Sequence, residues 1–404
     1  MTLQDTPSGE RLRIGFFGLR NAGKSSLVNA VAGQDLAVVS PVAGTTTDPV
    51  AKSMELLPLG PVVLVDTPGL DDDDAALGAE RVRRARRALA GADAAVLVVD
   101  AARGLSDEDR ALEREVRERG LPLLLAWNKA DLPGALPPPA GALAVSAATG
   151  AGVRGLKDAM GAAFAARAAE RAQKRLLGDL LAPGDTVVLV APIDAAAPKG
   201  RLILPQQQAL RDALDAHAAA LVCQPEELPR LLASLAAPPR LVVTDSQAFG
   251  RVARDVPADV PLTSFSILFA RYKGDLADLA RGAAALARLK DGDRVLVAEG
   301  CTHHRQCGDI GTQKLPRWIE SFCGAKPAFE FSSGGGFPDD LAGYALVVHC
   351  GGCMLTPQEM GARLARARAA GVPAVNYGVA IAHVHGVLRR ALGPFPDALA
   401  ALDG

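Results

Sequence analysis

The chain has 404 residues, enough for two or three domains, and its 49% hydrophobic and 22% charged residues are typical of a globular protein. A formal net charge of −1 disfavours a constitutive nucleic-acid-binding protein, which usually carries a basic excess. No apolar stretch reaches the length of a membrane span, and no signal-peptide pattern is visible. The composition therefore predicts a cytoplasmic protein that acts on neither membranes nor nucleic acid.

The first part of the chain alternates short β-rich segments with helical ones. The β-rich segments are nearly continuous apolar runs, as expected for strands buried on both faces of a parallel sheet. The predicted strands are 13–18, 61–66, 94–100, 121–128 and 142–146. We assign residues 9–172 to this α/β domain and predict a long Ala- and Arg-rich connecting helix over 153–180.

A phosphate-binding loop follows the first predicted strand. Residues 18–25, GLRNAGKS, match the P-loop pattern GxxxxGK[ST], between a strand and an apolar helix as this loop requires. Its glycines let backbone N–H groups close around phosphates at a helix N-terminus. We expect Lys24 to bridge the β- and γ-phosphates and Ser25 to bind Mg²⁺. The residues predicted to hold the phosphates are Asn21, Ala22, Gly23, Lys24, Ser25 and Ser26.

Two further motifs belong to the chemistry at the phosphates. Thr46, within GTTTD, offers a second hydroxyl to Mg²⁺. Asp66 opens the motif DTPG directly after a strand, which places its carboxylate near the water shell of the metal. We therefore predict Lys24, Thr46, Asp66 and Gly69 as the catalytic residues of a nucleotide hydrolase.

The base is predicted to be guanine. In the motif Asn128-Lys129-Ala130-Asp131, the carboxylate of Asp131 accepts hydrogen bonds from N1–H and the exocyclic amine, which adenine does not offer. Ser146 and Ala147 are expected to close over the base. Taken together, the five ordered motifs resemble the translation-factor-like GTPases of the Era and TrmE type.

Two departures from the usual GTPase pattern concern the rate of hydrolysis. Leu70 follows the DTPG motif at the position where many GTPases have the Gln that orients the attacking water, so hydrolysis is expected to be slow. Asn21 resembles the asparagine that binds an activating K⁺ in a subset of these enzymes. A K⁺ ion there would spread positive charge over the transition state.

The rest of the chain predicts two smaller α/β domains with mainly parallel sheets. The first, residues 180–262, has predicted strands at 186–193 and 240–245 and no recognisable catalytic motif, which favours a structural or self-association role. The second, residues 263–404, has its clearest strands at 293–298, 328–332, 344–348 and 373–377. We find no internal sequence repeat.

Five of the six cysteines lie between Cys301 and Cys353. Cys301 and Cys350 each follow a predicted strand, so in a parallel sheet both emerge at its carboxyl edge, where open α/β sheets build their sites. Gly351-Gly352 permits a tight turn that returns Cys353 to the same point. Cys307 and Cys323 are expected to be bystanders.

The residues alone leave two kinds of metal site open. Zinc accepts three cysteines and one histidine, but the one-residue gap between Cys301 and His303 is awkward for tetrahedral chelation. Iron–sulfur clusters accept cysteines from distant loops, which favours a 4Fe–4S cluster. His303 and His349 are candidates for a fourth ligand in either case.

The full pattern resembles one family, HydF, the GTPase scaffold that matures FeFe hydrogenase. The family pattern of Cys-x-His, a long interval and His-Cys-x-x-Cys is met by Cys301, His303, His349, Cys350 and Cys353. The segments 191–194, 201–207 and 309–311 also look like this family, so the resemblance covers nearly the whole chain.

The resemblance implies a K⁺-stimulated GTPase domain, a dimerisation domain and a cluster-binding domain in one cytoplasmic homodimer. It implies a 4Fe–4S cluster on Cys301, Cys350 and Cys353, whose fourth iron has a weak or exchangeable ligand. His303, His349, Glu299 or solvent are the candidates for that ligand. A diiron precursor would be carried there to apo FeFe hydrogenase, after two radical-SAM maturases have helped to build it.

Two other functions remain as alternatives. One is an RNA- or ribosome-directed GTPase with a structural zinc domain, which the near-neutral charge disfavours. The other is a GTP-gated iron–sulfur electron carrier. The chain lacks the Cys-x-x-x-Cys-x-x-Cys run that a radical-SAM enzyme needs, which favours a scaffold over a synthase.

Overall fold

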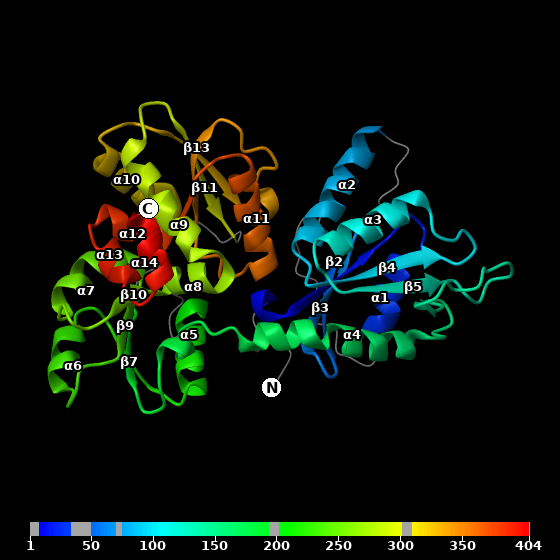
Figure 1. Cartoon of the computed structure of the whole chain (residues 1–404), viewed down its shortest axis with the longest axis horizontal. Coiled ribbons are helices and arrows are strands. Elements are labelled where there is room, and N and C mark those ends of the chain that lie inside the picture. Colours follow the sequence, from blue (N-terminus) through cyan, green and yellow to red (C-terminus); the bar gives the residue numbers. More distant parts are fainter. Residues whose placement is uncertain (1–7, 34–49, 70–74, 194–201, 301–308, 404) are drawn as a thin grey trace. The chain divides into compact units, whose positions relative to one another are not determined.

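The computed structural model describes residues 8–33, 50–69, 75–193, 202–300 and 309–403 (Figure 1). The chain divides into two compact units, Met1–Gln173 and Lys174–Gly404. Each unit has its own sheets and its own hydrophobic core. No helix in these ranges is long and apolar enough to cross a membrane.

The first unit is a six-stranded sheet in the order β2-β3-β1-β4-β5-β6, parallel except for β2, with helices on both faces. Its strands are β1 (Leu12–Phe17), β2 (Val50–Leu56), β3 (Gly60–Asp66), β4 (Ala94–Asp100), β5 (Leu123–Asn128) and β6 (Ala142–Ala144). Its α-helices are α1 (Lys24–Ala32), α2 (Ala75–Ala90), α3 (Asp107–Glu118) and α4 (Val153–Gln173).

The apolar runs of this sheet are explained by burial on both faces. Along β4, Val96 and Val98 pack into the core that contains residues of α1 and α4. Leu97 and Val99 alternate with them and pack into the opposite core, with residues of α2 and α3. A strand that lies between two helical layers has no solvent face, so every position can be apolar.

The second unit contains two four-stranded sheets in which every strand pair is parallel. The strands of the first are β7 (Thr186–Val190), β8 (Ala219–Cys223), β9 (Leu241–Thr244) and β10 (Leu262–Ser264). Those of the second are β11 (Arg294–Glu299), β12 (Ala328–Ser333), β13 (Tyr344–His349) and β14 (Ala374–Asn376). Together with the first unit, these sheets confirm the predicted fold class of a P-loop α/β domain followed by further parallel α/β sheets.

The helices of this unit cover and join its two sheets. They are α5 (Leu204–Asp215), α6 (Leu228–Ser234), α7 (Phe249–Asp255), α8 (Phe265–Lys273), α9 (Leu276–Gly282), α10 (Leu315–Cys323), α11 (Pro357–Ala369), α12 (Tyr377–Val384), α13 (Leu388–Leu392) and α14 (Pro396–Asp403). Helix α8 follows β10 of the first sheet and also contacts β14 of the second. One hydrophobic core includes Val188 of β7 and Val297 of β11, so the two sheets form one packed body (Figure 1).

The two small sheets share one topology. In the order β10-β9-β7-β8, the second strand lies on one side of the first, and the third and fourth lie on the other. The order β12-β11-β13-β14 follows the same rule. In such sheets the strands are added first on one side of the first strand and then on the other. The topological switch point therefore lies between the first and third strands, and a crevice forms there at their carboxyl ends. For the second sheet this crevice lies between β11 and β13.

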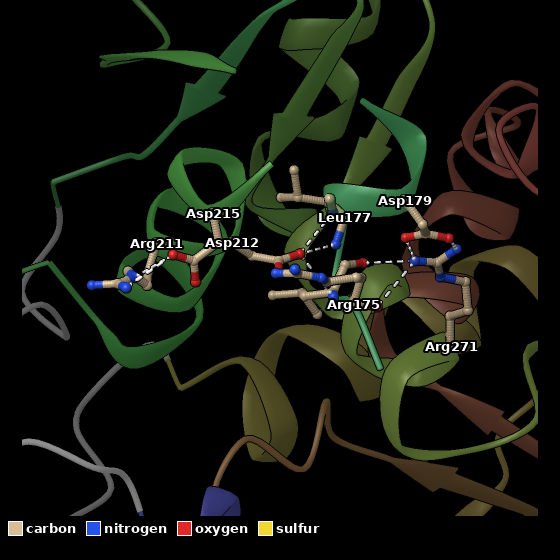
Figure 2. Close-up of polar contacts among 9 residues, drawn as sticks. Arg175, Leu177, Asp179, Arg211, Asp212, Asp215 and Arg271 are labelled. Atoms are coloured by element: carbon tan, nitrogen blue, oxygen red, sulfur yellow. Dashed lines mark hydrogen bonds and ion pairs between the residues drawn. The ribbon is translucent and has the colours of Figure 1, made fainter. Parts of the chain in front are cut away.

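The connecting helix, predicted over 153–180, ends earlier in the structure. Helix α4 ends at Gln173, because Asp212 of α5 accepts backbone N–H bonds from Leu176, Leu177 and Gly178 at 2.9, 2.8 and 2.7 Å. Figure 2 shows this contact and the ion pair between Arg271 of α8 and Asp179. These tertiary bonds hold residues 176–179 outside a continuous helix.

Candidate functional site

The P-loop has the backbone geometry that its glycines predict. Gly18 has φ 138°, and a Cβ atom there would lie 2.2 Å from the carbonyl oxygen of Val98. Gly23 has φ 90°, and its Cβ would lie 2.3 Å from Nδ2 of Asn128. Any larger side chain would push the loop away from the neighbouring elements, so both glycines are required by close approach and by conformation.

Lys24 points into the loop. Its ammonium group donates to the carbonyl oxygens of Gly18 at 3.0 Å and Leu19 at 2.7 Å, and the residue is 7% exposed. The loop therefore already holds a buried positive charge in the region that a P-loop offers to phosphates.

Ser25 and Asp66 form the candidate Mg²⁺ site. The Ser25 hydroxyl donates to Oδ2 of Asp66 at 2.6 Å, and Oδ1 of Asp66 is buried without a hydrogen-bond partner. A hydroxyl and a carboxylate with an unsatisfied oxygen are the hard oxygen donors that Mg²⁺ takes, usually while keeping several waters. These two residues fit the predicted ion. Thr46, the other predicted ligand, lies outside the described residues.

Gly69 lies against the P-loop. A Cβ atom at Gly69 would be 2.8 Å from the backbone nitrogen of Arg20, so only glycine allows this approach. Thr67 holds the segment by donating its hydroxyl to the carbonyl oxygen of Phe16 at 2.6 Å. Leu70, the residue on which the prediction of slow hydrolysis depends, lies outside the described residues.

The predicted guanine-reading motif joins the P-loop to the loop after β6. Asn128 donates from Nδ2 to the carbonyl oxygen of Ala22 at 2.8 Å and accepts at Oδ1 from the N–H of Ala147 at 3.1 Å. Asn128 thus holds both loops, while Asp131 is exposed to solvent, as a residue that reads the base must be. Ser146 is buried, and its hydroxyl oxygen accepts from the N–H of Thr149 at 3.1 Å.

Lys129 is fixed by an ion pair. Its ammonium lies 2.6 Å from Oδ2 of Asp100, at the end of β4. Burial alone would raise the pKa of Asp100, but the bond to Lys129 and that of the Ala102 N–H outweigh it and lower the pKa below its usual value. The Asp100 carboxylate therefore stays charged and keeps Lys129 in place beside the base loop.

The second candidate site lies at the carboxyl ends of β11 and β13. Cys350 follows β13 directly, and its sulfur accepts backbone N–H bonds from Gly300 at 3.1 Å and Gly352 at 3.4 Å. Gly352 has φ 63°, which allows the turn that leads to Cys353. The strands β11 and β13 are parallel neighbours, as predicted, and Gly300 at the end of β11 lies against Cys350. Cys301, Cys307 and His303 lie outside the described residues.

A cavity of about 290 Å³ opens beside this turn. Its walls come from the ends of both small sheets and include Ser266, Glu299, Cys350, Cys353 and Tyr377. Much of the rest is apolar, including Phe265, Phe269 and Ile381. At one wall the bare Cα of Gly311 faces the Glu299 carboxylate and the Tyr377 hydroxyl, which a Cβ there would meet at 2.7 and 2.3 Å.

Both ring nitrogens of His349 form hydrogen bonds within the protein. Its Nδ1–H donates to the carbonyl oxygen of Cys350 at 2.9 Å, and its Nε2 accepts from Arg363 at 3.0 Å. Burial, with a smaller effect of the Arg363 charge, lowers the pKa of His349 to about 3. Both ring nitrogens are thus engaged in a neutral imidazole, so the structure disfavours His349 as the fourth ligand.

The other cysteines and histidines that the structure describes do not form a further metal site. Cys223 is buried in β8, and the Cys323 thiol lies 3.8 and 3.7 Å from the carbonyl oxygens of Glu320 and Ala325. His383 and His385 pack edge-on against Phe322 and Trp318. Among the residues that the structure describes, no three His, Cys, Asp or Glu side chains gather in a group that could hold a metal ion.

The donor set still fits a cluster bound by cysteines. Cys350 and Cys353 supply two soft thiolates at one turn, and Cys301 follows directly on Gly300, whose N–H already contacts the Cys350 sulfur. Hydrogen bonds from backbone N–H groups to ligand sulfurs are among the features that tune iron–sulfur clusters. The two bonds to Cys350 would be of this kind if its sulfur bound a cluster.

Sequence reasoning missed two buried cations beside the turn, Lys273 and Arg363. Lys273 donates to three carbonyl oxygens of residues 352–355, and Arg363 binds His349. Neither belongs to a motif. The available signal was the presence of basic residues in two helical segments, a pattern that is also common on solvated helix faces.

Comparison with known proteins identifies the parts of the chain. Residues 176–274 match the Hydrogen maturase F dimerization domain, and residues 277–394 match the Hydrogen maturase F tetramerization domain. Residues 13–129 match the 50S ribosome-binding GTPase family. The first unit is therefore a GTPase domain that uses GTP and Mg²⁺, and the second carries domains of oligomer formation.

The curated relatives are GTPases. The tRNA modification GTPase MnmE of Methylorubrum populi is 43% identical over 162 residues, covering 39% of this chain and 34% of that protein. MnmE of Methylococcus capsulatus is 45% identical over 118 residues, covering 29% of this chain and 25% of that protein. The chain thus spans about a third or less of the length of these relatives.

Two solved structures are similar to part of the chain. Aquifex aeolicus Era is 19% identical, with a TM-score of 0.31, covering 52% of this chain and 93% of that chain. The G domain of the T. maritima FeoB iron transporter is 24% identical, with a TM-score of 0.28, covering 40% of this chain and 99% of that chain.

The two Hydrogen maturase F models adjoin each other and follow the GTPase match in the chain. This order agrees with the two sites described above, a P-loop in the first unit and a cysteine turn in the second. The chain belongs to the HydF family of hydrogenase maturation GTPases.

Proposed function

We propose that the chain is a GTP-hydrolysing scaffold that binds a 4Fe–4S cluster and carries the diiron precursor of the hydrogenase cofactor to apo FeFe hydrogenase. The observation that carries this proposal is the Cys350–Cys353 turn, which lines a cavity of about 290 Å³ at the switch point of the second small sheet. A protein of hydrogenase maturation that carries metal cargo would need a place for it, and this cavity is where we propose that the cargo binds.

In this proposal Cys301, Cys350 and Cys353 hold the cluster. Its iron without a cysteine ligand would supply an exchangeable coordination position when the cluster is bound. Glu299, 5% exposed and at the cavity wall, and His303 are the remaining candidates from this chain for that position. His349 is disfavoured, because Arg363 and the Cys350 carbonyl occupy its nitrogens.

The cavity walls would then receive the diiron cargo. Phe265, Phe269 and Ile381 give the cavity a mainly apolar lining that excludes water from a reactive metal centre. Ser266 offers a defined polar contact, since its hydroxyl oxygen already accepts from Nδ2 of Asn376 and the N–H of Gly378, both at 3.1 Å. Both lone pairs are used, which leaves its O–H free to donate to an occupant.

In the GTPase unit, Lys24 would neutralise the β- and γ-phosphates, and Ser25, Thr46 and Asp66 would hold Mg²⁺ directly or through water. Hydrolysis is proposed to be slow, because Leu70 replaces the water-orienting Gln, and to be faster with K⁺ bound at Asn21. Asn21 has φ 62°, a left-handed conformation that points to a specialised loop position.

We further propose that residues 9–172, 180–262 and 263–404 act as the GTPase, dimerisation and cluster-binding domains of a cytoplasmic homodimer. The partners are apo FeFe hydrogenase and the two radical-SAM maturases. The family models, which describe both a dimerization and a tetramerization domain, support self-association of this chain.

Anaerobic reconstitution with iron and sulfide tests the cluster. The wild-type chain should take up about four irons and become brown, and its reduced form should give a spin signal. Cys350→Ser and Cys353→Ser should lose that signal, while Cys323→Ser, a cysteine placed away from the turn, should keep it. A colourless protein with one tightly held zinc would overturn the cluster assignment and favour a structural zinc domain.

A further inference from the structure

Lys273, the last residue of α8, is buried against the cysteine turn. Its ammonium donates to the carbonyl oxygens of Gly352 at 3.1 Å, Cys353 at 2.8 Å and Leu355 at 2.7 Å. The residue is 3% exposed. One cation therefore uses its three donors on three carbonyls of a single turn.

Such an arrangement is costly unless the contacts are good. Burying an ammonium group in a protein costs several kcal/mol, and hydrogen bonds to carbonyls offset this cost only when their geometry is close to ideal. The carbonyl oxygens of Cys353 and Leu355 would lose this partner if the ammonium were removed, whereas that of Gly352 also accepts from the Leu355 N–H at 3.0 Å. Lys273 and the 352–355 segment thus depend on each other for their positions.

The rest of α8 braces the same turn. Ser266, Phe269 and Lys273 are spaced to lie along one face of the helix. Ser266 and Phe269 lie against Gly351, with Oγ of Ser266 3.4 Å and Cβ of Phe269 3.9 Å from the position of a Cβ atom there. Lys273 lies over the Phe269 ring, with 5.2 Å between the ammonium and the ring centroid.

Helix α8 is itself anchored elsewhere. Arg271 pairs with both carboxylate oxygens of Asp179, at 2.7 and 2.6 Å, and donates to the carbonyl oxygen of Leu176 at 3.0 Å (Figure 2). Residues 265–273 lie within the match to the dimerization domain, whereas the cysteine turn lies within the match to the tetramerization domain. The cysteine site is therefore supported by an element from outside its own domain match.

We propose that Lys273 is a positioning residue that holds the Cys350–Cys353 turn in its metal-binding shape and places a fixed positive charge behind the thiolates. This inference rests on the proposed metal-binding function of the turn. The charge would stabilise the anionic sulfurs of a metal-bound turn and would favour the reduced, more negative form of a bound cluster. Residues that support metal ligands from behind typically contribute 10- to 100-fold to metal affinity.

The test uses Co²⁺ as a probe on the full-length metal-free protein, with the thiolate-to-cobalt absorption as the readout. Lys273→Met removes the charge and all three donors at nearly constant length. We expect it to raise the dissociation constant for Co²⁺ about 10-fold or more. Lys273→Arg, which keeps the charge and the donors, should restore most of the affinity. The matched control is Lys314→Met, since Lys314 bonds Gln247 at 3.0 Å and not the turn.

A second readout separates the charge from packing. After reconstitution, Lys273→Met should shift the reduction potential of the cluster to more negative values, and Lys273→Arg should not. If Lys273→Met does not fold, Lys273→Gln, which keeps an N–H donor without the charge, takes its place with the same two expectations.

The outcomes distinguish this inference from the proposed function. Equal Co²⁺ affinity and equal potential in the wild type and the uncharged variant would overturn the role of Lys273 and leave the cluster intact. A wild-type chain that gives no thiolate-to-cobalt absorption would overturn the metal site itself.

Discussion

The hydroxyl of Ser25 donates a hydrogen bond of 2.6 Å to the carboxylate of Asp66 and thereby joins the start of α1 to the end of β3. The second carboxylate oxygen of Asp66 is buried and unsatisfied. A divalent ion that enters here with the nucleotide would replace the Ser25–Asp66 bond with metal contacts.

Replacing Ser25 with Ala should lower the GTP hydrolysis rate at least about 100-fold, because a catalytic metal contributes several kcal/mol to the transition state. Phosphate release under saturating GTP and Mg²⁺ measures it. Ser53→Ala is the matched control, since Ser53 lies in β2 and outside the predicted nucleotide site. Equal losses in the two variants would mean that Ser25 has no special role.

The wild-type enzyme should hydrolyse GTP faster in KCl than in NaCl at the same ionic strength. Asn21→Gly keeps the left-handed backbone conformation at φ 62° while it removes the amide, and should bring the ratio of the two rates close to one. Steady-state hydrolysis in the two salts is the measurement. Equal wild-type rates in both salts would remove K⁺ from the account.

His349→Leu should destabilise the chain by about 1–3 kcal/mol, because it leaves a donor of the buried Arg363 unsatisfied. Urea unfolding of the second unit measures this loss. The iron content per folded chain should stay at the wild-type level, since the ring nitrogens are engaged elsewhere. His349→Gln, which can still accept from Arg363, should recover stability. A stable His349→Leu protein that binds less iron would restore His349 as a ligand.

Cys223 should resist alkylation at neutral pH. Burial, with a smaller effect of Glu227, raises the pKa of its thiol to about 11 from an ordinary value of 9.0. The labelling rate should rise about tenfold per pH unit from pH 8 until near 11, because only the thiolate reacts. The unfolded chain ionises first, so the stability that this thiol contributes below pH 9 is lost as the pH rises towards 11. The measurement is iodoacetamide labelling, read at the peptide that contains Cys223. In urea, where the chain is unfolded, Cys223 should be labelled faster at neutral pH than in the folded protein.

The GTPase motifs were predictable because each is a local pattern with one structural context. The parallel pairing of β11 and β13, which places the loops after them at one edge of the sheet, was also predictable. The roles of Lys273 and Arg363 could not be predicted from local patterns. Lys273 contacts a residue 80 positions away in the sequence, and Arg363 contacts one 14 positions away. The shared topology of the two small sheets left no repeat in the sequence, because strand order constrains only the alternation of strands and helices.

The predicted helix over 153–180 shows the same limit. Its Ala-rich part, residues 153–173, favours helix, whereas the end of the segment has no Ala and contains Gly178. Only the carboxylate of Asp212, which comes from α5, binds the N–H groups of residues 176–178 and holds them in another conformation. Tertiary contacts of this kind override local propensity.

The central claim, that the cysteine site carries the metal cargo of hydrogenase maturation, is tested most directly by transfer. The chain would be purified anaerobically after coexpression with the two radical-SAM maturases and added to apo FeFe hydrogenase, with hydrogen evolution as the readout. The account predicts activation by the wild-type chain and loss of activation with Cys350→Ser, while Cys323→Ser remains active. Activation by Cys350→Ser at the wild-type level would contradict it.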